Sequence, residues 1–217
     1  MKHCYTQLHQ SPYRNLLLAC ATALAVAFTV SPPQPVHANP HLEPLLVPPN
    51  LQVPAGHKVF FVGHAVGTQQ YICLSPGAWT FFGPQATLFD DNEKQVTTHF
   101  LSPNPSPDDP LGSDTPRPTW QHSKDTSAVW AAPIASSSDS AFVAPGAIPW
   151  LLLEVVGAEE GPTGSHKLTA ATFIQRLNTV GGVAPLTDCT LGQKELVPYE
   201  ADYFFYKAAK SGAGGGN

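Results

Sequence analysis

The chain has 217 residues, of which 42% are hydrophobic and only 12% are charged, and its formal net charge is −5. This length suits one domain with a sizeable core, and the apolar content excludes a charged, disordered chain. The negative charge, and the lack of a Lys/Arg stripe with interleaved aromatic residues, argue against nucleic acid as a partner.

The first 38 residues are predicted to be a cleavable signal peptide. Arg14 precedes an apolar run from Leu16 to Val30, and we expect cleavage after Ala38. The run is short for a membrane-spanning helix, which needs about twenty residues, although an uncleaved anchor is the alternative. Lipid attachment at Cys20 is disfavoured because the apolar run continues beyond it. We therefore expect a secreted or periplasmic protein with no membrane span after cleavage.

Two cysteines, Cys73 and Cys189, remain after this cleavage. An even count in an oxidising compartment predicts one disulfide between them. A catalytic thiol with a histidine partner is the disfavoured alternative, because two free thiols rarely persist outside the cytoplasm.

In chain order, residues 39–52 form a Pro-rich lead-in that is predicted to be extended. The domain is predicted over 53–206, where short segments of strand character are bounded by Gly, Pro, Asn or Ser. These segments are His57–Val62, Gln69–Leu74, Trp79–Phe82, Ala86–Phe89, Val96–Leu101, Thr119–His122, Ala128–Ala132, Trp150–Val156, Leu168–Leu177 and Tyr199–Tyr206. Because no stretch repeats apolar residues at helical spacing over three turns, the prediction is a single all-β domain with one disulfide, either a sandwich or a barrel.

Four polar or glycine-containing regions are predicted to be irregular. Residues 102–118 hold six prolines and almost no apolar side chains, which indicates a mobile surface insertion too polar to contribute to the core. Residues 207–217 are predicted to be a flexible Gly-rich tail. Gly63–Gly67 and Gly181–Gly182 are predicted to be loops.

Several strings, taken in order, resemble the bacterial and fungal secreted family called domain of unknown function 3455. They are Val53–Gly56, Ala65–Cys73, Trp79, His99–Phe100, Thr119–Trp120, Pro149–Leu153, Ile174–Gly182 and Val197–Tyr206. The resemblance covers residues 53–206. The family pattern runs from the histidine directly through Gly-Pro to Thr-Trp, whereas here the Pro-rich insertion separates His99 from Trp120. The resemblance implies a domain boundary and carries no established activity.

Arg176 lies in a segment where Phe173, Gln175 and Leu177 alternate with Thr172, Ile174 and Arg176, as on a strand with two faces. One interpretation is that Arg176 forms an ion pair with Asp202 or Glu200 of the last strand.

The other interpretation is a polar pocket for a carboxylate or a sugar. Its walls would be Gln175, Arg176 and Asn178, close to Gln69 and Tyr71 of the 63–71 segment. These five residues are the candidate ligand-binding residues.

Other chemistry finds less support in the sequence. His57, His64, His99 and His122 lie in or beside strands, but their spacing matches no metal motif, so no metal site is predicted. Tyr71, Trp79, Trp120 and Trp150 are either a stacking surface for a sugar or, as we prefer, core residues.

No catalytic motif and no cofactor motif is present, so we expect no cofactor, and the catalytic residues, if any, are unknown. The leading hypothesis is a non-enzymatic binding module for a small ligand, glycan or envelope partner. The alternative is an extracytoplasmic hydrolase or other small-molecule enzyme with its site around Gln175, Arg176 and Asn178. The sequence leaves the ligand, the oligomeric state and the question of catalysis open.

Overall fold

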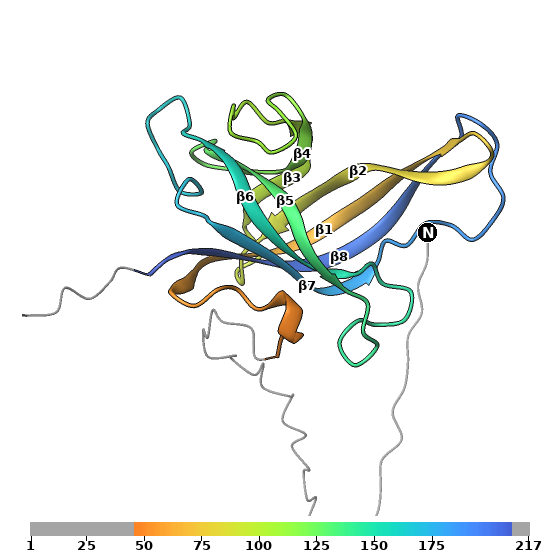
Figure 1. The fold of residues 1–217 in the computed structure, drawn as a ribbon, viewed down its shortest axis with the longest axis horizontal. Coiled ribbons are helices and arrows are strands. Elements are labelled where there is room, and N and C mark those ends of the chain that lie inside the picture. The colour runs from red at the N-terminus through yellow and green to blue at the C-terminus, as the bar shows by residue number, and fades with distance from the viewer. Residues whose placement is uncertain (1–45, 210–217) are drawn as a thin grey trace, which may run out of the picture. The chain divides into compact units, whose positions relative to one another are not determined.

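The alternating apolar and polar residues of the chain form one antiparallel β-barrel in the computed structural model, which describes residues 46–209 (Figure 1). A short 3₁₀ helix, η1 (Pro49–Leu51), precedes the strands. The strands are β1 (His57–Leu74), β2 (Ala78–Phe89), β3 (Gln95–Pro103), β4 (Pro116–His122), β5 (Ala128–Ser137), β6 (Trp150–Glu159), β7 (Phe173–Gly181) and β8 (Lys194–Ala208). Each strand pairs with the next, and β8 pairs with β1 to close the barrel. The all-β prediction is confirmed, and of its two forms the barrel is observed.

The predicted signal peptide, Cys20, the start of the lead-in and the end of the Gly-rich tail lie outside the described residues. Within residues 46–209, no helix is both long enough and apolar enough to cross a lipid bilayer.

The predicted loop Gly63–Gly67 is wrong, because these residues continue β1 without a break. Their glycines allow close approach of β2: a Cβ atom on Gly67 would lie 2.2 Å from the backbone oxygen of Gln85. The pair Gly181 and Gly182 does need permissive dihedrals, with φ values of 64° and 84°. The segment Leu168–Thr172, predicted as strand, instead precedes β7, where Leu168 is fully buried.

The interior of the barrel is filled at one end by side chains from all sides of the wall. They include Phe61, Leu88, Trp120, Val129, Ile174 and Phe205. Alternation explains this packing, because every second residue of a barrel strand points inward. The core is therefore the inner face of the barrel, as in small closed barrels generally.

A second apolar cluster lies on the outer face of β6, β7 and β8. Trp150, Leu177 and Phe204 from the wall pack there with Leu51 of η1 and Val143 of the β5–β6 connection. The described part of the lead-in is thus packed against the barrel and contains a helical turn, which differs from the extended segment expected. Burial of Leu51 gives the reason, since an apolar side chain gains free energy by leaving water.

The Pro-rich insertion 102–118 also differs from its expected form. Its two ends belong to β3 and β4, and the segment between them is organised by buried polar groups. Arg117 Nε donates a hydrogen bond of 2.9 Å to Asp109, and Asn104 Nδ2 donates one of 2.7 Å to the same carboxylate. The Arg117 guanidinium holds the pKa of Asp109 well below its usual range. The polar side chains of Asn104, Asp109 and Arg117 thus hold the segment together through a buried ion pair and its hydrogen bonds.

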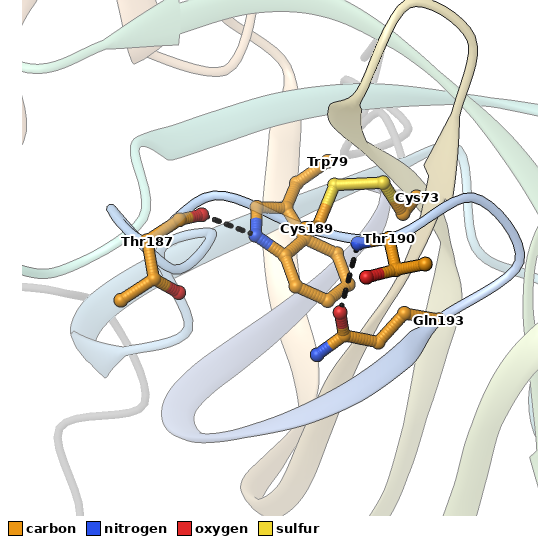
Figure 2. Close-up of a disulfide and its surroundings, with 6 residues drawn as sticks. All are labelled: Cys73, Trp79, Thr187, Cys189, Thr190 and Gln193. Atoms are coloured by element: carbon orange, nitrogen blue, oxygen red, sulfur yellow. Dashed lines mark hydrogen bonds between the residues drawn. A yellow bond between two sulfur atoms is a disulfide. The ribbon is translucent and has the colours of Figure 1, made fainter.

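The predicted disulfide is confirmed, and it joins the end of β1 to the β7–β8 connection (Figure 2). The Cα atoms of Cys73 and Cys189 are 5.9 Å apart. Beside the bond, Trp79 Nε1 donates to the backbone oxygen of Thr187 at 3.0 Å, and Thr190 N donates to Gln193 Oε1 at 3.0 Å. Residues 183–193 have no regular strand pairing, so the disulfide and the hydrogen bond from Trp79 fix them against the barrel, while the Thr190–Gln193 hydrogen bond is internal to the segment.

Candidate functional site

A cavity of about 240 Å³ lies in the part of the barrel that the core side chains leave unfilled, and it is partly open, because the exposed Phe81 belongs to its wall. Most of its wall is apolar or aromatic and comes from prolines, leucines, Phe81 and Trp120. The polar side chains of the wall are those of Gln69, Tyr71, His99, Arg176 and Tyr203. A concave, mainly apolar site with a few convergent polar groups is the usual form of a small-molecule binding site.

The cavity and the filled core meet at a stack of three rings. His99 of β3 lies flat on Trp120 of β4, with ring centroids 4.2 Å apart, because the two residues are direct cross-strand partners. Tyr203 of β8 meets the His99 ring edge-on at 5.1 Å. All three side chains are almost completely buried, so they form a rigid wall.

His99 is a neutral residue in this wall. Burial lowers the pKa of its imidazole to about 3; the backbone oxygen of Thr119 opposes this shift, and the charge of Arg176 adds to it. Its Nδ1 lies 2.9 Å from the Thr119 oxygen, which can only accept a hydrogen bond. Nδ1 therefore carries the proton, and Nε2 is left as an acceptor.

Arg176 is the only cationic residue of the cavity wall, because His99 is neutral. Its Nη2 donates to the backbone oxygen of Pro149 at 2.8 Å, and its Nε is buried without a hydrogen-bond partner. Among the described residues, no carboxylate lies within ion-pairing distance of this guanidinium. The wall contains no acidic side chain.

The predicted ion pair of Arg176 with Asp202 or Glu200 is wrong. The register of β7 and β8 places Arg176 opposite Tyr203, whereas Asp202 is opposite Leu177 and Glu200 opposite Val180. Because neighbouring residues of a strand point to opposite faces, Tyr203 points into the barrel with Arg176 and Asp202 points outward.

Gln69 and Tyr71 of β1 lie in the same cavity wall as Arg176. The Gln69 side chain is buried and its Nε2 has no hydrogen-bond partner. Tyr71 donates a 2.7 Å hydrogen bond to the backbone oxygen of Gly182, and burial raises the pKa of its hydroxyl while the Arg176 charge opposes that shift. Three of the five candidate ligand-binding residues thus share one cavity.

Gln175 and Asn178 do not lie in that cavity. Gln175 points to the outer face, where its Nε2 donates to the backbone oxygen of Leu51 at 2.6 Å and its Oε1 accepts from the Tyr206 hydroxyl at 2.7 Å. The Asn178 side chain is exposed to solvent, and its Nδ2 donates a hydrogen bond of 2.8 Å to Asp202 Oδ2. The expected shared pocket of Gln175, Arg176 and Asn178 is therefore not formed.

The four strand histidines occupy four separate environments. His57 contacts the backbone oxygen of Pro54, His99 lies inside the barrel, and His122 Nδ1 is 2.8 Å from Asp125. His64 lies on the outer face between two carboxylates, with Nδ1 2.6 Å from Asp202 and Nε2 2.9 Å from Asp91. Over residues 46–209, no group of three His, Cys, Asp or Glu side chains has the arrangement of a metal site.

The His64 pair with Asp202 is expected to make stability depend on pH. The hydrogen bond that His64 donates to Asp202 raises the pKa of His64 to about 9, partial burial opposes this shift, and Asp91 adds to the increase. A histidine whose pKa is higher in the folded state stabilises it fully below its unfolded pKa of about 6.5, and this contribution disappears as the pH rises through about 9.

The free energy of unfolding of the unmodified protein should therefore fall between about pH 6.5 and 9, and this fall should be smaller in a His64→Gln variant. Urea denaturation at a series of pH values measures both slopes, and NMR titration of the His64 ring checks the cause. Equal slopes in the two proteins would show that His64 does not carry this dependence.

The four aromatic residues do not form one stacking surface, and the preferred interpretation as core is confirmed for Trp120 and Trp150, which are buried. Tyr71 and Trp120 line the cavity, Trp150 is part of the outer apolar cluster, and Trp79 lies against the disulfide loop. The sequence did not indicate His99 and Tyr203 as cavity residues. The signal that could have found His99 is its position two residues after the inward-facing Thr97 in a strand of regular alternation.

A gap in the wall lies beside this cavity. The ladder between β2 and β3 joins only Ala86–Phe89 to Gln95–His99, so Phe100–Pro103 pair with β4 but have no partner in β2. A second cavity of about 620 Å³ occupies this place, and Pro84 and His99 line both cavities. In Figure 1, β2 and β3 diverge in this region. The gap gives the inner cavity a side in contact with the surface.

Fold and site together define a closed antiparallel β-barrel with an internal, mainly apolar cavity. Residues 54–207 match the model of a family described as a protein of unknown function, DUF3455, and the chain belongs to that family. No curated protein matches the chain. No solved structure matches it either.

Proposed function

We propose that this protein is a non-enzymatic, extracytoplasmic binding protein that holds a small, largely apolar molecule inside its barrel. The observation that carries the proposal is the internal cavity with its apolar wall and its small set of polar side chains. Barrels of eight strands are wide enough to hold one small ligand when side chains leave part of the interior unfilled.

The buried polar groups of the wall support this proposal. Gln69 Nε2, Trp120 Nε1 and Arg176 Nε belong to residues that line the cavity, and none of these donors has a hydrogen-bond partner. Buried donors almost always have an acceptor in folded proteins, since an unsatisfied one costs about 1–3 kcal/mol. A ligand with acceptor atoms would lower that cost after a side-chain rotation that turns these shielded donors toward the cavity.

An extracytoplasmic location is part of the proposal. The apolar run before Ala38 has the pattern of a signal peptide, and a disulfide of the Cys73–Cys189 kind is compatible with an oxidising compartment. A binding protein for the periplasm or the medium fits both features.

Native mass spectrometry of the protein recovered from its own secretion route tests the proposal. We expect a small molecule to remain bound, or neutral probes such as hexanamide and phenylacetamide to bind in calorimetric titration. Leu151 lines the cavity, so a Leu151→Trp variant should fill the space and abolish binding. Val66 is exposed on the barrel surface, so Val66→Trp is the matched control and should bind normally. Equal binding by both variants, or no binding by the unmodified protein, would reject the proposal.

A further inference from the structure

We infer that the molecule held in the barrel is an organic monocarboxylate with an apolar body, and that its carboxylate is bound by Arg176. This inference rests on the proposed function and specifies its ligand.

The first argument is the unbalanced charge of Arg176. A guanidinium stays protonated at all physiological pH values, and a desolvated charge in a protein is normally offset by an opposite charge. The hydrogen-bond partners of the Arg176 side chain are neutral oxygens, the backbone oxygen of Pro149 at 2.8 Å and the Tyr203 hydroxyl. No described carboxylate lies within ion-pairing distance, and the cavity wall supplies none. An anionic ligand would complete the missing pair.

The second argument is that the other polar groups of the wall are neutral and leave the positive charge of Arg176 uncompensated. Burial keeps His99 unprotonated and keeps the hydroxyls of Tyr71 and Tyr203 protonated. The charge of Arg176 acts on the titration of all three groups, in the direction expected from a nearby positive charge. The electrostatic potential inside the cavity is therefore positive, and the charge that produces it is that of Arg176.

The third argument concerns the kind of anion. A single guanidinium matches the planar, two-oxygen geometry of a carboxylate, which Arg binds through two parallel hydrogen bonds. A phosphate monoester or a dicarboxylate would bring a second negative charge for which this wall has no cation. The leucines, prolines and aromatic rings around Arg176 suit an apolar remainder.

Calorimetric titration with matched acids and amides tests the inference. The probes are hexanoate against hexanamide, and phenylacetate against phenylacetamide, because each pair differs in charge and hardly in shape. The unmodified protein should bind each acid at least about tenfold more tightly than its amide. In an Arg176→Met variant, acid binding should weaken by about thirtyfold or more, while amide binding should change by less than about threefold.

Lys58 offers a matched control for the loss of one positive charge. Its side chain is exposed near the start of β1, where its backbone lies opposite that of Lys207 in β8. The cavity residues of β1, Gln69 and Tyr71, lie much further along the strand. A Lys58→Met variant should bind acids and amides as the unmodified protein does. Amide binding by Arg176→Met also serves as the check that this variant is folded, together with its circular dichroism spectrum.

The results separate the two levels of the proposal. If the unmodified protein binds amides as well as acids, or if Arg176→Met retains acid binding, the carboxylate inference is rejected and the cavity still stands as a binding site for neutral molecules. If neither class of probe binds and no molecule is carried through purification, both the inference and the proposed function are rejected.

Discussion

Replacing both Cys73 and Cys189 with alanine should lower the free energy of unfolding by about 4–5 kcal/mol. The two residues are 116 positions apart, so the bond removes the entropy of a long loop from the unfolded chain. The loss is a large part of the stability of a typical domain, which is about 5–15 kcal/mol. Urea denaturation of the double variant, compared with the unmodified protein with and without a reducing agent, measures it.

The disulfide variant should also lose affinity for the cavity probes. Cys189 lies in the β7–β8 connection, and the same connection contains Gly182, whose backbone oxygen accepts the hydrogen bond of the cavity residue Tyr71. Without the disulfide the β7–β8 connection is held less firmly, so Tyr71 loses part of the support that orders it in the cavity wall. A double variant whose stability lies within about 1 kcal/mol of the unmodified protein would mean that barrel closure alone orders these residues.

Trp120→Ala is expected to have the second large effect, a loss of about 3–5 kcal/mol in the free energy of unfolding. The Trp120 side chain is fully buried and contacts the rings of His99, Tyr203 and Phe205. Its removal leaves a void that this closed wall cannot collapse to fill, and it takes away the surface on which the neutral His99 stacks.

The same substitution joins the cavity to the space of the missing ring, so the variant should accept bulkier probes than the unmodified protein does. Trp79→Ala is the control, because Trp79 is only partly buried and its indole N–H contacts a surface loop. Chemical denaturation compares the two variants. Equal losses for Trp120→Ala and Trp79→Ala would contradict the role of Trp120 as the base of the cavity.

Local patterns in the sequence were enough to predict most of the strand segments, the fold class, the disulfide and the family, although β1 and β2 were each predicted as two shorter strands. Alternation in Phe173–Leu177 and in Tyr199–Tyr206 correctly indicated strands with two distinct faces. The family model confirms the resemblance drawn from scattered strings. These features depend on neighbouring residues, or on a pair of cysteines with no other cysteine partner outside the predicted signal peptide.

Which face of a strand lies inside could not be predicted, because both faces of β7 are buried. Gln175 and Leu177 are covered on the outer side by η1 and the β5–β6 connection, while Ile174 and Arg176 point inward. With apolar neighbours on both sides, composition does not distinguish the faces. The sequence therefore grouped Gln175 with Arg176, although the barrel wall separates them.

Closure and register were also beyond local reasoning. A barrel differs from a sandwich through the pairing of β8 with β1, whose residues are far apart in the chain. The mispredicted pair of Arg176 and Asp202 has the same origin, since a shift of one residue in register exchanges the two faces of a strand.

The incomplete ladder between β2 and β3 has a consequence for solubility. A closed barrel normally has no free strand edge, but here two short backbone stretches face each other unpaired and could template the addition of strands from other molecules. Proline lacks the N–H group that such addition requires, and Pro84 and Pro103 lie on the two sides of this gap. The prolines beside this gap thus oppose the edge-to-edge addition of strands from other molecules.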